Sequence, residues 1–136
     1  MKNQNNSISA EKLTKIRIKR LYSKLRAMKI LNPGWDGDDA QPPSEEVLLA
    51  SESVIKYLKV LNLIPSRIES SVENGVGFTF EDRDNFGYAE FLNLGSVCFL
   101  MEKNRKNTHV WEVELSNALA IENSFQMMDS FFITKI

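Results

Sequence analysis

The segment that decides the fold covers residues 67–81 and reads RIESSVENGVGFTFE. Residues 67–72 are typical of a β-strand, and the dipeptide Asn74-Gly75 is a strong signal for a short hairpin. On the returning strand apolar residues alternate with other residues with a period of two, so one face of the strand is apolar. That face carries Val76, Phe78 and Phe80.

Three further strands follow this hairpin. They are predicted at 87–92, 96–103 and 108–115, and the connections between them are short and polar. Because short connections join antiparallel neighbours, we expect a meander of about five antiparallel strands. On the last strand apolar residues alternate with Glu112 and Glu114, so one face of the sheet is apolar and the other is largely wet.

Helical periodicity flanks the strands on both sides. Ser9 is the expected N-cap of a helix that continues to Leu31, and Ser44 is the expected N-cap of a second helix that closes at 62–65. A third helix begins after Ser116 or Asn117, and its tail FFITKI is apolar enough to pack on the sheet or to contact another copy. Its expected apolar stripe is Leu119, Ile121, Phe125, Met128 and Phe132.

The fold class predicted from these patterns is α+β. Two N-terminal helices and one C-terminal helix pack on one face of the antiparallel sheet. A chain of 136 residues corresponds to one domain. Within it we expect residues 1–8 to be frayed, 9–31 to form the first helix, and 32–136 to form an α+β body.

Charge is strongly divided along the chain. Residues 1–32 contain nine lysines or arginines and one acid, a net charge of +8, whereas the rest of the chain has a net charge of -9. A basic first helix of this kind indicates an acidic partner, the acidic body of the same chain, or a second copy of the chain. The candidate binding residues on it are Lys12, Lys15, Lys19, Arg20, Lys24 and Arg26.

The same helix supports a nucleic-acid interpretation, because lysine and arginine on one element can neutralise phosphates. Against it, Tyr22 is the only aromatic residue among these cations, and the acidic remainder of the chain would repel a polyanion. A protein partner with an acidic surface fits the pattern at least as well.

The loop at 34–42, GWDGDDAQP, has an unusual composition. We expect it to be structural, with Trp35 buried beneath the second helix, Asp36 in an Asx-type turn, and Gly37 at a positive φ. The alternative is a hard-cation site for Mg²⁺ or Ca²⁺, with Asp36, Asp38 and Asp39 as ligands.

This loop also resembles a family of small, poorly characterised bacterial and phage-associated proteins. In that family a WDG-x-x-A-x-P element precedes a helix, a proline, and a hairpin with an Asn/Asp-Gly turn. The chain differs at Asp38 and Asp39, where an aromatic residue and a glycine are common. The resemblance covers residues 32–115 and implies an inhibitor, an antitoxin-like protein or an accessory binder, without an active site. The matching positions are Trp35, Asp36, Gly37, Ala40, Pro42, Pro65, Asn74 and Gly75.

Few enzyme classes fit the remaining inventory. With Cys98 and His109 as the only cysteine and histidine, a zinc site from one chain is excluded, and a Cys-His nucleophile pair would require the two to meet by chance. We find no phosphate-binding glycine loop, dinucleotide fingerprint or nucleophile elbow. A carboxylate-based hydrolase stays open, because eighteen acids are present and only geometry could select a pair.

The sequence therefore predicts a protein that binds rather than catalyses, with no cofactor and no metal. We expect a cytoplasmic inhibitor or antitoxin-like protein of phage or mobile-element type, because no apolar run has the length of a membrane span and the start of the chain lacks a secretory signal. The first helix is expected to carry part of the recognition. A homodimer through the first or the last helix is a further expectation.

Overall fold

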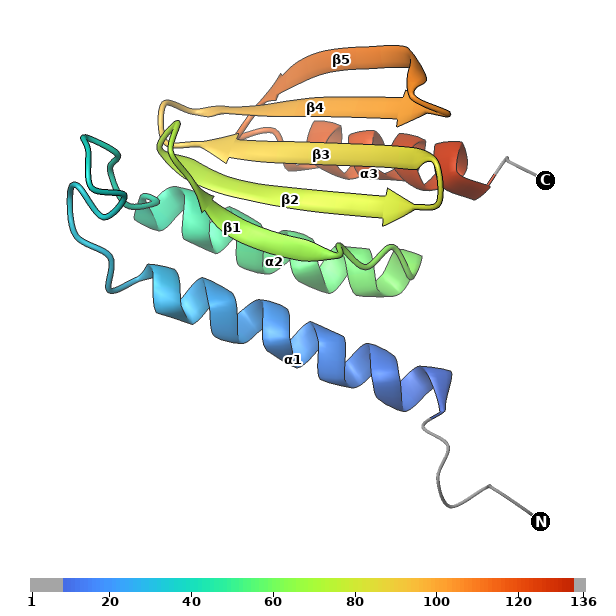
Figure 1. Ribbon diagram of the computed structural model, residues 1–136, viewed down its shortest axis with the longest axis horizontal. Coiled ribbons are helices and arrows are strands. Elements are labelled where there is room, and N and C mark those ends of the chain that lie inside the picture. Colours follow the sequence, from blue (N-terminus) through green and yellow to red (C-terminus); the bar gives the residue numbers. More distant parts are fainter. Residues whose placement is uncertain (1–8, 134–136) are drawn as a thin grey trace.

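The computed structural model describes residues 9–133, which fold into helices and strands in the predicted α+β order (Figure 1). Residues 1–8, expected to be frayed, and 134–136 of the apolar tail lie outside the described residues. The helices are α1 (Ala10–Met28), α2 (Glu45–Leu61) and α3 (Ala118–Ile133). The strands are β1 (Arg67–Ser71), β2 (Gly75–Asp82), β3 (Asn85–Leu92), β4 (Ser96–Lys103) and β5 (Lys106–Glu114).

The five strands form one antiparallel sheet in the order β1-β2-β3-β4-β5. Each strand pairs with its neighbour in sequence, so the predicted meander is confirmed. In Figure 1 the helices α2 and α3 lie behind the sheet, while α1 runs alongside β1 and α2. The helices therefore occupy one side of the sheet and leave its other face without a covering element among residues 9–133.

The first hairpin is confirmed, but its turn lies one residue earlier than the Asn74-Gly75 pair suggests. Ser71 pairs with Gly75, which leaves a three-residue loop that ends with Asn74 at a φ of 72°. Gly75 already belongs to β2, where a Cβ atom would overlap the backbone carbonyl of Phe91. Close packing of two backbones, rather than turn conformation, is what requires glycine at this position.

The predicted helix starts are confirmed at atomic detail. The hydroxyl of Ser9 accepts a hydrogen bond from the N–H of Lys12, and the hydroxyl of Ser44 accepts one from Val47. α1 ends at Met28, three residues before the expected Leu31, because the next backbone N–H groups bond to carbonyls three residues back and tighten the final turn.

The core lies between the sheet and the helices. Phe125 of α3 packs among four phenylalanine rings of the sheet, with ring centroids 5.1 to 6.5 Å apart. α1 belongs to the same core, since its apolar stripe is buried against α2 and β1. The stripe of α1 consists of Ile18, Leu21, Leu25 and Met28.

One expected core residue of the third helix is misassigned. Asn117 caps α3, since its side-chain carbonyl accepts from the N–H of Ala120. Ile121, Phe125, Met128 and Phe132 are buried, but Leu119 is 67% exposed because it lies in the first turn, on the side away from the sheet. The buried Phe132 shows that the last turns of α3 pack on the sheet, where a Cβ at Gly87 would contact its ring.

Candidate functional site

The basic residues of α1 surround its buried stripe and face solvent. All six candidates, from Lys12 to Arg26, are exposed. Among residues 9–133 the ion pairs are those of Arg67, with Glu69 at 3.0 Å and with Glu81 at 3.8 Å. The interpretation in which α1 pairs with the acidic body of its own chain therefore finds no ion pair in the described part of the structure.

The six cations do not form one continuous patch. Lys19 and Arg26 border the cleft between α1 and α2, whereas Lys24 lies on the opposite flank, beside Ile68 and Ser70 of β1. This division follows from the helical repeat of about 3.6 residues per turn, which spreads closely spaced residues around the helix. Each flank of α1 therefore presents its own positive surface.

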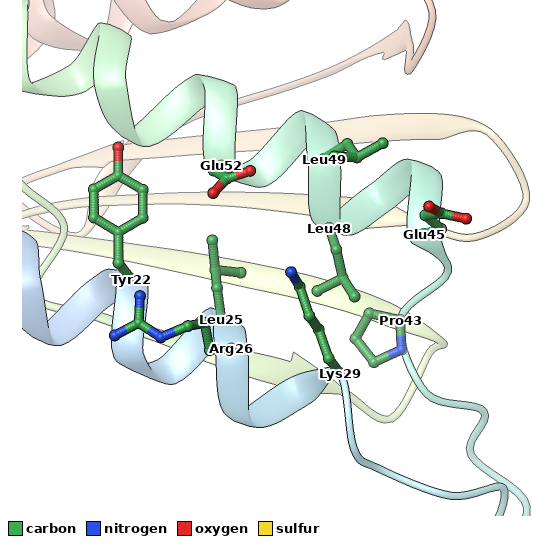
Figure 2. Close-up of a pocket in the computed structure, with 9 residues that line it drawn as sticks. All are labelled: Tyr22, Leu25, Arg26, Lys29, Pro43, Glu45, Leu48, Leu49 and Glu52. Carbon is green, nitrogen blue, oxygen red and sulfur yellow. The ribbon is translucent and has the colours of Figure 1, made fainter.

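A groove with a volume of about 430 Å³ lies beside these cations, between α1 and α2 (Figure 2). Leu25 and Leu48 point into it from the two helices. We call it the α1–α2 groove. Its lining consists of Tyr22, Leu25, Arg26, Lys29, Pro43, Glu45, Leu48, Leu49 and Glu52.

The two walls of the α1–α2 groove carry opposite charges. Arg26 of α1 and Lys29, its C-cap residue, line one side, and Glu45 and Glu52 line the other side from α2. None of these four makes an ion pair within residues 9–133, although a guanidinium N–H of Arg26 donates to the hydroxyl of Ser23 at 3.1 Å. The arrangement offers an apolar floor between a cationic rim and an anionic rim.

Tyr22 lines the α1–α2 groove together with these charged residues. Partial burial raises the pKa of Tyr22, and the negative charge of Glu52 raises it further. The phenol therefore stays neutral at physiological pH and keeps a hydrogen-bond donor between the two charged walls.

The loop 34–42 has the local geometry expected of its Asp-Gly pair. One carboxylate oxygen of Asp36 accepts from the N–H of Asp38 at 3.0 Å and from the N–H of Ala40 at 3.2 Å. Gly37 has a φ of 84°. The Asx-type turn and the positive φ are both confirmed.

Trp35 departs from expectation, because it is half-buried rather than buried beneath the second helix. It lies beside Met28 and Leu31 at the end of α1 and close to Ile68 of β1. Its indole N–H donates to the carbonyl of Gln41 at 3.1 Å, so the ring closes the loop on itself. α1 ends early and leaves this position on the β1 side of the molecule.

The cation-site alternative for the loop is not supported. Asp36, Asp38 and Asp39 are exposed, and within residues 9–133 no three acidic, histidine or cysteine side chains gather as ligands of one metal ion would. One carboxylate oxygen of Asp36, Oδ1, already accepts from two backbone N–H groups.

Hydrogen bonds join the loop to two turns of the sheet. The N–H of Gln41 donates to the side-chain carbonyl of Asn74 at 2.7 Å, and the N–H of Ser44 donates to that of Asn93 at 2.8 Å. The amide group of Asn93 also donates to the carbonyl of Pro42 at 3.0 Å. The motif positions Pro42 and Asn74 therefore lie together in space, and Asn93, from the connection between the strands predicted at 87–92 and 96–103, joins them.

Cys98 and His109 do not form a catalytic pair. His109 pairs with Met101 on the helix-covered face and contacts the ring of Phe131. Cys98 pairs with Glu112 and lies on the opposite face, since successive residues of a strand alternate. Burial raises the pKa of the Cys98 thiol, and the charges of Glu112 and Glu90 raise it further, so little nucleophilic thiolate forms at neutral pH.

Comparisons with known proteins identify no relative: no family model, no curated protein and no solved structure matches the chain. Across residues 9–133, every helix falls short of the length or the apolar character required to cross a membrane. The site is therefore interpreted from its own chemistry.

Proposed function

We propose that the protein acts by binding an acidic protein partner through α1 and the adjoining α1–α2 groove. The observation that carries this proposal is the set of exposed cations on α1 that find no carboxylate partner within residues 9–133. Charges of this kind accelerate encounter with a surface of opposite sign.

The α1–α2 groove supplies apolar surface, which the charges alone do not. Exposed ion pairs are worth only about 0 to 1 kcal/mol each, so a stable complex also needs buried apolar area. The half-buried Leu48 and the 56% exposed Leu49 provide an apolar surface beside Arg26 and Lys29. An acidic segment with apolar side chains would match both features.

The same geometry favours a protein over a nucleic acid. Glu45 and Glu52 form the wall opposite the cations, so a phosphate backbone in the groove would meet two carboxylates at close range. The remainder of the chain beyond residue 32 carries a net charge of -9. Nucleic-acid binding by the same helix is the competing outcome of the test below.

The finer role, an inhibitor or antitoxin-like protein of a phage or mobile element that works in the cytoplasm without catalysis, is also proposed. Its support is the resemblance carried by Trp35, Asp36, Gly37, Ala40 and Pro42. An inhibitor needs a recognition surface and no catalytic constellation, which suits a site built from unpaired cations and an apolar groove.

The test is charge reversal on α1. Removal of the helix would be uninformative, because Ile18, Leu21, Leu25 and Met28 belong to the core and their loss would unfold the chain. Lys15→Glu/Lys19→Glu/Arg26→Glu changes only exposed residues. The matched control Arg83→Glu/Arg105→Glu/Lys106→Glu makes the same change in net charge at exposed positions outside α1.

Immobilised wild-type protein and both variants are compared for the proteins they retain from the native host. We expect one directly bound acidic protein. Its association rate should be severalfold lower for the α1 variant than for wild type, and little changed for the control. Equal retention by all three proteins would contradict the role of α1. Retention of a nucleic acid, with an affinity that falls steeply as salt is added, would favour nucleic-acid binding over a protein partner.

A further inference from the structure

The face of the sheet opposite the helices has a pattern that the proposed function leaves unused. In-register pairing arranges its side chains in rows that run across the strands. One row is largely apolar and continues from β2 to β5 through directly paired residues. Its members are Thr79, Tyr88, Leu100 and Val110.

Acidic residues flank this apolar row on both sides. Two residues from the row in one direction along the strands lie Glu81 and Glu102, and two residues in the other direction lie Glu90 and Glu112. On β1, Arg67 pairs with Thr79 at the end of the row, and Glu69 lies two residues beyond Arg67. The side chains share the face because residues two apart in a strand point the same way. We call this arrangement the open sheet face.

Most of the negative charge on the open sheet face is not neutralised. Arg67 pairs with Glu69 and Glu81 at the β1 edge. Glu90 accepts hydrogen bonds from the hydroxyls of Ser71 and Tyr88, and Glu102 accepts one from Thr108, so these carboxylates have neutral partners. The field they create is visible at Cys98, whose pKa is raised by burial and then by Glu112 and Glu90.

Apolar side chains in the row remain accessible. Val110 is 69% exposed, and Leu100 and Tyr88 are half-buried, the latter with its ring over Gly77. Four strands spaced by about 4.8 Å give the row a length of about 14 Å, which equals nearly three turns of an α-helix. The glutamates lie about 7 Å to either side, close to the outer radius of a helix with its side chains.

We infer that the open sheet face docks a cationic amphipathic helix of a partner protein, with an apolar seam on the row of Leu100 and Val110 and lysines or arginines on both flanks over the glutamates. A helix satisfies this pattern because its apolar stripe has polar neighbours on both sides, whereas an extended strand alternates between two faces. The occupant is not α1 of a second copy, because the apolar stripe of α1 is already buried in its own core. This surface is separate from α1, and its charge is opposite.

The probe is a synthetic, end-capped 14-residue helix with leucines along one seam, lysines on both flanks and alanine elsewhere. A second peptide has glutamate in place of every lysine. Backbone amide NMR shifts of the full chain are followed on titration. We expect saturable binding of the lysine peptide with shifts centred on β3, β4 and β5, and no binding of the glutamate peptide.

Two variants test the two parts of the surface. Glu102→Gln/Glu112→Gln removes one carboxylate from each flank beside Leu100 and Val110, and we expect about tenfold weaker binding, since each exposed pair is worth severalfold. Leu100→Thr/Val110→Thr places β-branched residues, which suit a strand, at both positions while reducing the apolar row, and we expect a loss of at least tenfold. The matched control Glu46→Gln/Glu122→Gln removes the same charge from exposed helix positions and should bind as wild type does.

Three results would overturn the inference: no saturable binding, shifts located on the helices, or equal weakening by the Glu46/Glu122 control. A fourth contrary result is self-association of the protein that rises with its concentration and disappears in Lys15→Glu/Lys19→Glu/Arg26→Glu. This result would mean that the open sheet face binds the α1 cations of a second copy. The same α1 variant is expected to bind the lysine peptide as wild type does, so failure of the proposed function and failure of this inference are distinguishable.

Discussion

The backbone N–H of Gln41 donates a 2.7 Å hydrogen bond to the side-chain carbonyl of Asn74. This contact spans 33 positions of sequence and joins the loop before α2 to the turn between β1 and β2. Asn74 has a φ of 72°, so one residue supplies both the left-handed conformation of the turn and the acceptor that holds the loop.

Asn74→Ala is expected to lower the free energy of unfolding by about 2 kcal/mol, because alanine loses the acceptor and is strained in the left-handed region. Chemical denaturation measures this change. Asn74→Gly is the matched control, since glycine accepts the positive φ and loses only the hydrogen bond, with an expected cost of about 1 kcal/mol. A stability equal to wild type in Asn74→Gly would show that the Gln41 contact contributes nothing.

Trp35→Ala is expected to destabilise the protein by about 1 to 3 kcal/mol, less than the ~3 to 5 kcal/mol typical of a fully buried aromatic residue. The reason is that Trp35 is half-buried and its indole bonds within its own loop. Phe125→Ala, at a fully buried position, supplies the upper reference in the same denaturation experiment. Equal losses at the two positions would mean that Trp35 is a core residue.

Ser51→Ala is expected to stabilise the protein by about 1 kcal/mol. The Ser51 hydroxyl is buried in α2 and has no hydrogen-bond partner within residues 9–133, so its removal relieves a desolvation cost and improves helix propensity. The thermal midpoint measures the gain.

Ser124→Ala is the contrasting variant for this prediction. The Ser124 hydroxyl accepts from the indole of Trp111 at 2.9 Å and donates to the carbonyl of Ala120 at 2.8 Å. Its loss should destabilise by about 1 to 3 kcal/mol, because the partly buried indole N–H of Trp111 is left without its acceptor. A lower midpoint for Ser51→Ala would contradict the assignment of an unpaired hydroxyl.

Tyr88 makes stability fall at high pH. Burial and the charge of Glu90 raise the pKa of Tyr88 from 10.0 to about 12. The raised pKa means that the folded state favours the neutral phenol of Tyr88. The stability that this preference adds is complete below pH 10 and is lost as the pH rises from 10 towards 12.

Denaturation measured across this interval should show the loss in wild type and a weaker dependence in Tyr88→Phe. The difference in tyrosinate absorbance between the two proteins isolates Tyr88 from Tyr22, whose pKa is also raised. If the difference spectrum showed Tyr88 ionising near pH 10, the prediction would be contradicted.

Local patterns in the sequence determined the elements of this fold. Period-two alternation around Phe78 and Phe80 predicted the strands, and short polar connections predicted their antiparallel order, because neighbouring strands have little choice of partner when the loop is short. The caps at Ser9 and Ser44 were predictable for the same reason, since a capping hydroxyl bonds only three residues ahead.

The candidate site was predicted in part. The sequence identified the cations of α1 and the apolar stripe that packs them against the body. It could not show that Lys19 and Arg26 face α2 while Lys24 faces β1, nor that Glu45 and Glu52 form the wall opposite Arg26. These relationships depend on how one helix is placed beside another, which helical periodicity alone does not fix.

Tertiary structure alone decided the burial of Trp35, the contact of Asn93 with the loop, and the separation of Cys98 from His109 onto two faces. It also aligned Tyr88, Leu100 and Val110 in one row, because strand register sets which residues lie opposite one another. The physical division is one of range: alternation, caps and turns are set by neighbours within a few residues, whereas a charge, a groove or a row of side chains is set by residues that only the folded chain brings together.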